Sequence, residues 1–380
     1  MANYEREVAI GSILASSISP HARPVISVTS PELSTSKSHI IYKVHGKDHE
    51  GSFEVHRRYR DFAAIRAILV SHWPGCYIPQ IPPKQMIGNM DKNNIERRRK
   101  LLDVFVNKMS LVPHLYNSMP FQSFIKSPVA FEHCIKDYEN KSYMDIAADF
   151  IVTFHELSDM KIGPNDEEEV TRTLEYFIYA LACFEAFEAI CKQNVEVFYE
   201  FEDSMEGLIG SMKEINEFYM EYYDSKGYEV QQKDYFTNPY LILLDWCRAE
   251  ILDLKAIIEA IEKRGKFLQK KRKTLQKFDS ELKNLTSIKS GKKRKSLFSP
   301  RGEKEQKDVV EKMESEAKAM DTIFRISTLQ LVHKDFLVFK QYKVHKHEVI
   351  LRTFSSASVE EFRSLASQII DLENPYKPID

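Results

Sequence analysis

The feature that most constrains this 380-residue chain is a set of long apolar repeats in its C-terminal half. Apolar side chains recur at alternating intervals of four and three residues from Val170 to Tyr219, from Tyr240 to Leu282 and, more weakly, from Val310 to Val338. This spacing keeps one apolar stripe on a helix over many turns and is typical of coiled coils. The sequence therefore predicts three long helices, joined by polar links at 224–239 and 287–302, in an elongated antiparallel bundle.

Polar residues interrupt the first of these stripes at Glu188, Glu202 and Asn216. Regular polar positions on an otherwise apolar stripe usually specify the register or the choice of partner. This pattern favours a dimer, and a monomeric three-helix bundle is the alternative.

The N-terminal third has a different pattern. Residues 1–22 are Ser-rich and are predicted to be a flexible leader. Three short β-rich runs follow and predict an antiparallel meander, at 25–30, 38–44 and 52–57. Helical periodicity begins at 62–69 and returns at 94–109, and the prolines between these segments predict an extended loop. The expected class of this part is α+β, with a small three-stranded antiparallel sheet and helices on one side.

The formal net charge of -2 conceals three strongly charged segments. Residues 21–131 sum to +8, residues 145–224 to -16 and residues 263–307 to +13. Crowded like charges repel one another unless they face water or an oppositely charged partner, so the basic segments indicate anionic partners. The acidic segment would be repelled by an anionic bilayer. It would have to face away from the bilayer, pair with the basic helix or bind a protein.

Other features of the sequence exclude several classes of protein. The five cysteines form no CxxC pair, so we expect neither a disulfide framework nor a metal site. No stretch of 18 uncharged apolar residues is present, and the N-terminus does not resemble a secretory signal. Nucleophile-elbow and phosphate-loop motifs are absent. We therefore expect a soluble protein of a reducing compartment, without a cofactor, that is not an enzyme.

One short segment carries the strongest functional signal. His56-Arg57-Arg58-Tyr59-Arg60-Asp61-Phe62 lies where a predicted strand ends and a helix begins. Arginine offers a planar fork to phosphate oxygens, and a neighbouring aromatic ring offers a face to the apolar side of a sugar. Lys84 ends the proline-rich loop, and Arg98 lies near the start of the next helix. These residues are predicted to form one basic pocket.

This order of motifs resembles the PX domain, and the whole chain resembles sorting nexins of the PX-BAR type. The resemblance implies that Arg58 binds the 3-phosphate of phosphatidylinositol 3-phosphate and that Tyr59 packs under the inositol ring. It implies that Lys84 contacts the 1-phosphate and that Arg98 binds the inositol hydroxyls, with Arg97 and Arg99 as one-residue alternatives. The implied domains are a PX domain at 23–131, a linker with an amphipathic helix at 132–165 and an all-α three-helix BAR-like coiled coil at 166–380, which dimerises.

A basic patch is expected to contact anionic membrane. Its residues are Lys270, Lys271, Arg272, Lys273, Lys292, Lys293, Arg294 and Lys295. A nuclear-localisation signal or a solvated loop is the alternative for the second half of this patch. The linker helix within Tyr143 to Met160 has an acidic polar side, so we expect it to pack against the PX domain or the bundle and not to enter a membrane.

The resemblance implies a peripheral protein on the cytosolic face of endosomal membranes. Such a protein would bind phosphatidylinositol 3-phosphate and sense or induce membrane curvature in endosomal sorting and intracellular protein transport. Its implied partners are a second copy or another BAR-type sorting nexin, and a retromer-like cargo complex, but no nucleic acid. The alternative is a phosphoinositide-tethered adaptor whose coiled coil binds proteins without bending membrane.

Overall fold

The computed structural model describes residues 24–34, 39–84, 91–138, 141–222, 237–290 and 303–373. The chain forms two compact units. Unit 1 comprises residues 1–178 and 252–340, and unit 2 comprises residues 179–251 and 341–380. No helix in the described ranges has both the length and the apolar character that crossing a bilayer requires.

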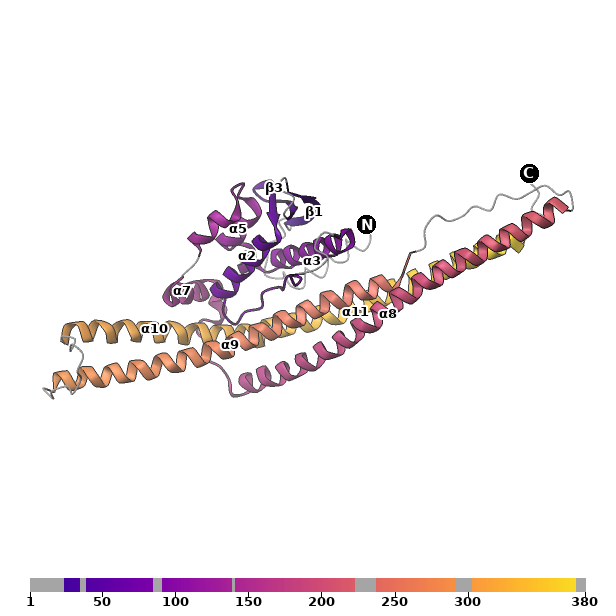
Figure 1. Cartoon of the computed structure of the whole chain (residues 1–380). Helices are drawn as coiled ribbons and strands as arrows, with labels where there is room; N and C mark the ends of the chain where they lie inside the picture. The colour runs from indigo at the N-terminus through magenta and orange to yellow at the C-terminus, as the bar shows by residue number, and fades with distance from the viewer. Residues whose placement is uncertain are drawn as a thin grey trace, which may run out of the picture. The chain divides into compact units, whose positions relative to one another are not determined.

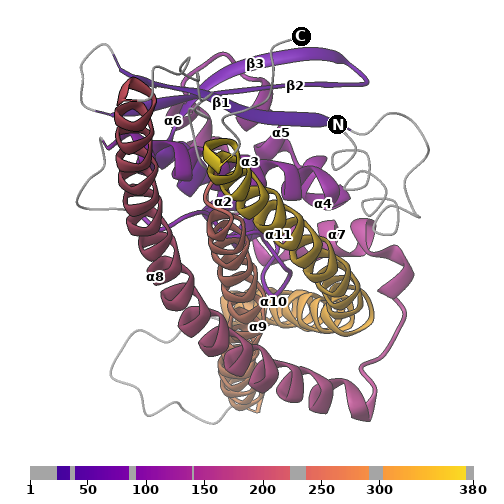
Figure 2. The same ribbon diagram turned by 90° about the vertical axis from the view of Figure 1, so that its right-hand side faces the viewer.

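Unit 1 contains the expected antiparallel meander. Strands β1 (Val25–Leu33), β2 (Ile40–Asp48) and β3 (Gly51–Arg58) lie in the order β1-β2-β3, with β2 in the middle (Figure 2). Pairing of β2 with β3 continues to Asp48 opposite Gly51, so the turn is shorter than the sequence suggested. Gly51 has a φ of 130°, a conformation that residues with a Cβ rarely adopt.

Short helices cover the sheet and close an aromatic core. They are α2 (Tyr59–His72), α3 (Lys92–Leu111), α4 (Pro113–Tyr116) and α5 (Met119–Lys126). Phe62 of α2 is fully buried and its ring contacts those of Tyr42, Phe105 and Phe124, with 5.0 Å between the Phe62 and Phe124 centroids. Residues 77–84 form neither helix nor strand, as their prolines predicted. The α+β class is therefore confirmed.

The segment that follows the sheet and its helices packs on two parts of unit 1. It contains α6 (Phe131–Cys134), a 3-10 turn (Ile135–Asp137), α7 (Tyr143–Thr153) and a second 3-10 turn (His155–Leu157). Helix α7 buries Ile146, Ala147 and Phe150 and lies along α10 (Figure 1). The Phe150 ring is 5.2 Å from that of Trp73, at the end of α2. The expectation that this helix packs within the protein is confirmed.

The long helices predicted from the repeats are present. They are α8 (Pro164–Tyr222), α9 (Tyr240–Lys289), α10 (Glu303–Gln330) and α11 (Phe336–Glu373). The links predicted at 224–239 and 287–302 lie largely outside the described residues. A π-helical turn, Leu331–Asp335, joins α10 to α11. Because a π turn inserts an extra residue, it shifts the phase of the apolar stripe for the helix that follows, α11.

Within unit 1, polar contacts attach the sheet domain to α9. The Arg66 Nη2 donates to Glu259 Oε2 at 2.5 Å, and the Tyr77 hydroxyl donates to Asp253 Oδ1 at 3.2 Å. Lys108 forms an ion pair with the same carboxylate of Asp253, which is only 3% exposed. A buried carboxylate is stabilised by such partners, so these contacts fix α9 against the proline-rich loop and α3.

Unit 2 has its own core around Trp246 of α9. The Trp246 ring contacts that of Phe184 at 5.4 Å and stacks on that of His347 at 5.5 Å. Its Nε1 donates to Glu250, which also pairs with Lys343 at 2.5 Å. Three helices thus supply the core of this unit, and the Trp246 indole and the Glu250 carboxylate are paired within one chain.

Candidate functional site

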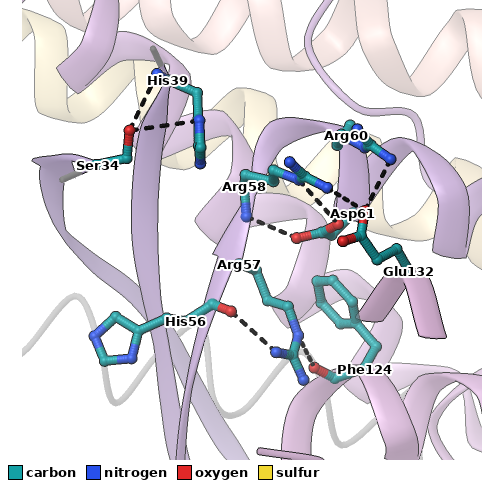
Figure 3. Close-up of polar contacts among 9 residues, drawn as sticks. All are labelled: Ser34, His39, His56, Arg57, Arg58, Arg60, Asp61, Phe124 and Glu132. Atoms are coloured by element: carbon teal, nitrogen blue, oxygen red, sulfur yellow. Dashed lines mark hydrogen bonds and ion pairs between the residues drawn. The ribbon is translucent and has the colours of Figure 1, made fainter. Parts of the chain in front are cut away.

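Two adjacent arginines at the end of β3 have opposite environments. Arg57 is buried, and its guanidinium donates to the Phe124 carbonyl at 2.8 Å (Figure 3). It also donates to the Ser127 carbonyl at 2.5 Å. The group also lies 5.7 Å from the Phe124 ring centroid. Burial lowers the pKa of Arg57. Because its donors are used inside the domain, Arg57 supports the fold and is not available to a ligand.

Arg58 is the N-cap residue of α2, and its side chain is a quarter exposed. Its Nη2 donates to Glu132 Oε2 at 2.5 Å, and its Nε is 3.7 Å from Asp61 Oδ1. The Asp61 carboxylate also accepts the backbone N–H of Arg58 at 2.9 Å, which satisfies a donor at the start of the helix. Strand alternation therefore turns Arg57 inward, and the helix start holds Arg58 at the rim.

Tyr59 and Arg98 lie together. The Arg98 guanidinium is 5.2 Å from the Tyr59 ring centroid, and the Tyr59 hydroxyl donates to the Pro82 carbonyl at 2.7 Å. Burial raises the pKa of Tyr59, and the positive charge of Arg98 opposes that shift. The neighbours of Arg98 have other contacts: Arg97 donates to Asn94, and Arg99 donates to Glu96 and to the Val28 carbonyl.

Lys84 is exposed at the end of the described part of the proline-rich loop. It lies two residues beyond Pro82, and two extended residues span at most about 7 Å of backbone. The hydrogen bond from Tyr59 to Pro82 therefore brings the base of Lys84 to the neighbourhood of the Tyr59 ring.

Strand β3, the start of α2, the proline-rich loop and α3 thus contribute to one site. The site combines one planar guanidinium at its rim, a second guanidinium over an aromatic ring and an exposed ammonium group. Such an arrangement can bind a phosphate and present an aromatic edge to a ring-shaped headgroup. No cluster of potential metal ligands occurs in the part of the chain that the structure describes.

Two acidic residues of this site were missed by the sequence analysis. Asp61 had a detectable signal, because an acid at the third helical position often caps the helix start. Glu132 had none, since it lies 74 residues after Arg58 in the sequence and reaches the site only through the fold.

The basic patch divides into residues with internal contacts and residues that face solvent. Lys270 contacts the hydroxyl and ring of Tyr143, and Lys271 pairs with Asp321. Arg272 and Lys273 are exposed. The other four predicted residues, Lys292, Lys293, Arg294 and Lys295, lie outside the described residues.

A second apolar stripe follows the outer side of α8 in unit 2. We call it the α8 outer stripe; its exposed residues are Ile190, Val197, Phe201, Leu208, Ile215, Phe218 and Tyr222. They fall on a separate series of four-and-three intervals from the residues that α8 buries. Exposed apolar residues that recur with this period favour packing against another helix.

Of the polar exceptions on the inner stripe, Glu188 forms ion pairs within the chain. Glu188 pairs with Arg248 at 3.1 Å and with Lys192 at 2.9 Å. Burial, together with the nearby acids Glu361, Glu206 and Asp203, raises the pKa of Glu202. The side chain of Asn216 lies outside the described residues. The observation that favours a second copy is therefore the α8 outer stripe and not these exceptions.

Comparison with known proteins defines the class of the N-terminal part. Residues 45–128 match the family model of the PX domain. This range contains Arg58, Tyr59, Lys84 and Arg98, so the site described above lies in a PX domain.

Curated relatives are sorting proteins. The chain is 38% identical over 97 residues to vacuolar protein sorting-associated protein vps5 of Schizosaccharomyces pombe, which covers 24% of this chain and 17% of that protein. It is 28% identical over 200 residues to sorting nexin 1 of Arabidopsis thaliana, with 48% of this chain and 50% of that protein covered. The chain thus spans half or less of the length of these relatives.

The fold extends the similarity beyond the PX domain. A chain of the SNX-BAR Mvp1 tetramer, solved by cryo-EM, superposes with a TM-score of 0.57 at 16% identity, covering 91% of this chain and 99% of that one. A PX domain followed by long packed helices is therefore the architecture of this protein, and its fold is that of a sorting nexin of the PX-BAR type.

Proposed function

We propose that this protein is a non-enzymatic peripheral membrane protein that binds phosphatidylinositol 3-phosphate on the cytosolic face of endosomes. In this proposal Arg58 binds the 3-phosphate, Tyr59 packs against the inositol ring, Lys84 binds the 1-phosphate and Arg98 binds inositol hydroxyls. The single observation that carries the proposal is the grouping of Arg58, Tyr59 and Arg98 in a PX domain.

The second part of the proposal is that the protein self-associates through unit 2. The dimer would then sense or induce membrane curvature during cargo sorting. The α8 outer stripe supports it, because a second copy of the same helix region would cover those apolar side chains. Two lipid sites in one dimer raise the effective concentration of the second site after the first has bound. The exposed Arg272 and Lys273 would add diffuse attraction to an anionic surface.

Co-sedimentation with vesicles tests the lipid site. The wild-type protein should bind phosphatidylcholine vesicles that contain phosphatidylinositol 3-phosphate, and Arg58→Ala should reduce this binding by at least tenfold, because it removes a charge-assisted phosphate contact. Lys47→Ala is the matched control, since it removes an exposed positive charge from β2 of the same domain. Equal losses in both variants, or no loss in Arg58→Ala, would contradict the assignment of the site.

A second candidate function is a phosphoinositide-tethered adaptor that does not bend membrane. The observation that favours it is the set of exposed acids on α8, including Glu196, Glu200, Glu206 and Glu214, which an anionic bilayer would repel. Electron microscopy of vesicles with the bound protein separates the two functions. Tubules support curvature generation, and bound but undeformed vesicles support the adaptor.

A further inference from the structure

A carboxylate is paired with the guanidinium that would bind phosphate in the proposed lipid site. One oxygen of Glu132, Oε2, accepts from Arg58 Nη2 at 2.5 Å and from Arg60 Nη2 at 3.0 Å (Figure 3). Asp61 Oδ1 lies 3.7 Å from Arg58 Nε. Two acids therefore balance the charges of two arginines, and the rim of the site is locally neutral before any ligand arrives.

The position of Glu132 is fixed by the fold. Its neighbour Phe131 is buried and packs edge to face on Phe124 with 5.3 Å between ring centroids. The Arg57 guanidinium, 6.0 Å from the Phe131 ring, also donates to the Ser127 carbonyl in the turn before α6. The buried Arg57 thus holds in place the segment that carries Glu132, and Glu132 in turn pairs with Arg58.

A phosphate that binds Arg58 must compete with this carboxylate. Both anions accept from the same guanidinium, and two anions at one fork repel each other. A phosphomonoester carries nearly two negative charges and three acceptor oxygens, so it can replace the single carboxylate oxygen. A phosphodiester, with one charge, gains less from the same exchange.

We infer that Glu132 is an anionic gate at the lipid site, which a phosphomonoester headgroup must displace from Arg58. This inference rests on the proposed phosphoinositide site. The gate weakens binding of every anion at Arg58 and leaves singly charged lipids below the threshold for binding, so that Glu132 contributes to ligand selection without contacting the bound headgroup.

The test compares the wild-type chain with Glu132→Gln, which removes the charge and keeps the size of the side chain. Glu54→Gln is the matched control, because Glu54 is an exposed acid of β3 that pairs with Lys43 at 2.8 Å. The probes are vesicles with phosphatidylinositol 3-phosphate, vesicles with phosphatidylinositol, and soluble inositol 1,3-bisphosphate. The soluble probe separates the pocket from the membrane surface.

Glu132→Gln should bind both the phosphoinositide vesicles and the soluble bisphosphate about threefold to tenfold more tightly, the range expected for release of a partly exposed ion pair. Glu54→Gln should stay within about twofold of the wild type, because a screened surface pair contributes little. In an Arg58→Ala background, Glu132→Gln should give no gain, since the gated group is absent.

The outcomes separate the two inferences. If neither the wild type nor Glu132→Gln binds the phosphoinositide, the proposed function fails. If the wild type binds through Arg58 but Glu132→Gln is no tighter, the gate is wrong and the function stands. Equal gains in Glu132→Gln and Glu54→Gln, or a gain restricted to vesicles, would assign the effect to diffuse charge and would also overturn the gate.

Discussion

The two units bury similar helices in different ways. In unit 1 the core of the PX domain is continuous with apolar residues of α10, such as Met320 and Ile323, and α7 covers part of that helix. In unit 2 α8 buries Cys191, Val195 and Phe198 of its inner stripe, whereas the α8 outer stripe is exposed. The difference shows that one heptad pattern can complete a core within a chain while another on the same helix stays exposed.

The largest expected effect is on the core of unit 1. Phe62→Ala removes a fully buried ring between Tyr42, Phe105 and Phe124 and should lower the free energy of unfolding by about 4 kcal/mol. Urea denaturation measures the change, and the loss should not depend on protein concentration. A loss below about 1 kcal/mol would show that this core is less tightly packed than described.

The next largest effect is expected at the α8 outer stripe of unit 2. Leu208→Asp combined with Ile215→Asp places two charges on the α8 outer stripe and should weaken self-association at least about a hundredfold, because a buried unpaired charge is costly. Analytical ultracentrifugation measures the change as a shift from dimer to monomer.

Leu275→Asp supplies the control for that experiment, since Leu275 is an exposed leucine on a long helix of unit 1. This variant should have the same molar mass in analytical ultracentrifugation as the wild-type protein. A wild-type protein that stays monomeric at every concentration would contradict the proposed role of the stripe.

A smaller effect concerns the attachment of the PX domain to α9. Asp253→Asn keeps the shape of the side chain but removes the charge that Lys108 pairs with, and it should cost about 2 kcal/mol of stability. Hydrogen exchange should then increase in α3 and the proline-rich loop. Glu262→Gln, at an exposed acid of the same helix, should change neither quantity.

The smallest effects are opposite pH dependences in the two units. In unit 1, burial lowers the pKa of His72 from 6.5, and its Nε2 lies 2.8 Å from the Tyr138 carbonyl. Because the folded state disfavours the charged imidazole, its contribution to stability is present above pH 6.5 and is lost as the pH falls below that value. The difference in unfolding free energy between the wild type and His72→Gln should therefore vary with pH in this window.

In unit 2, burial and neighbouring acids raise the pKa of Glu202 above 4.5. The folded state then binds the proton more readily than the unfolded state, so this residue opposes stability at neutral pH and the penalty fades as the pH falls toward 4.5. Glu202→Gln should be slightly more stable than the wild type at pH 7, and the gain should shrink in acid. A gain that is constant with pH would exclude ionisation as its cause.

The sequence predicted the elements whose signals are local or periodic. Strand alternation and proline placement gave the meander and the extended loop, and the four-and-three repeats gave the long helices. The third repeat could be followed only to Val338, and the π turn at Leu331–Asp335 was not predicted, because no local residue type marks such a turn. The α8 outer stripe was missed because the inner stripe, which is more regular, masks it.

The site was predicted in part. Arg58, Tyr59 and the proline-rich loop follow each other closely at one strand end, so their proximity could be read from the sequence. The contact of Arg98 with Tyr59 depends on how α3 packs, and the three adjacent arginines could not be distinguished without it. The role of Glu132 could not be predicted, since a contact between residues 74 positions apart produces no periodic or local pattern in a single sequence.

The most direct test measures vesicle binding by a variant that keeps the proposed lipid site in unit 1 but should no longer self-associate through unit 2. The Leu208→Asp, Ile215→Asp double variant should bind phosphatidylinositol 3-phosphate vesicles at least about tenfold more weakly than the wild type, because one site per particle lacks the gain from bivalency. The residual binding should still require Arg58, since all residues of the proposed lipid site lie in unit 1. Binding as tight as that of the wild type, or residual binding that persists after Arg58→Ala, would contradict this account.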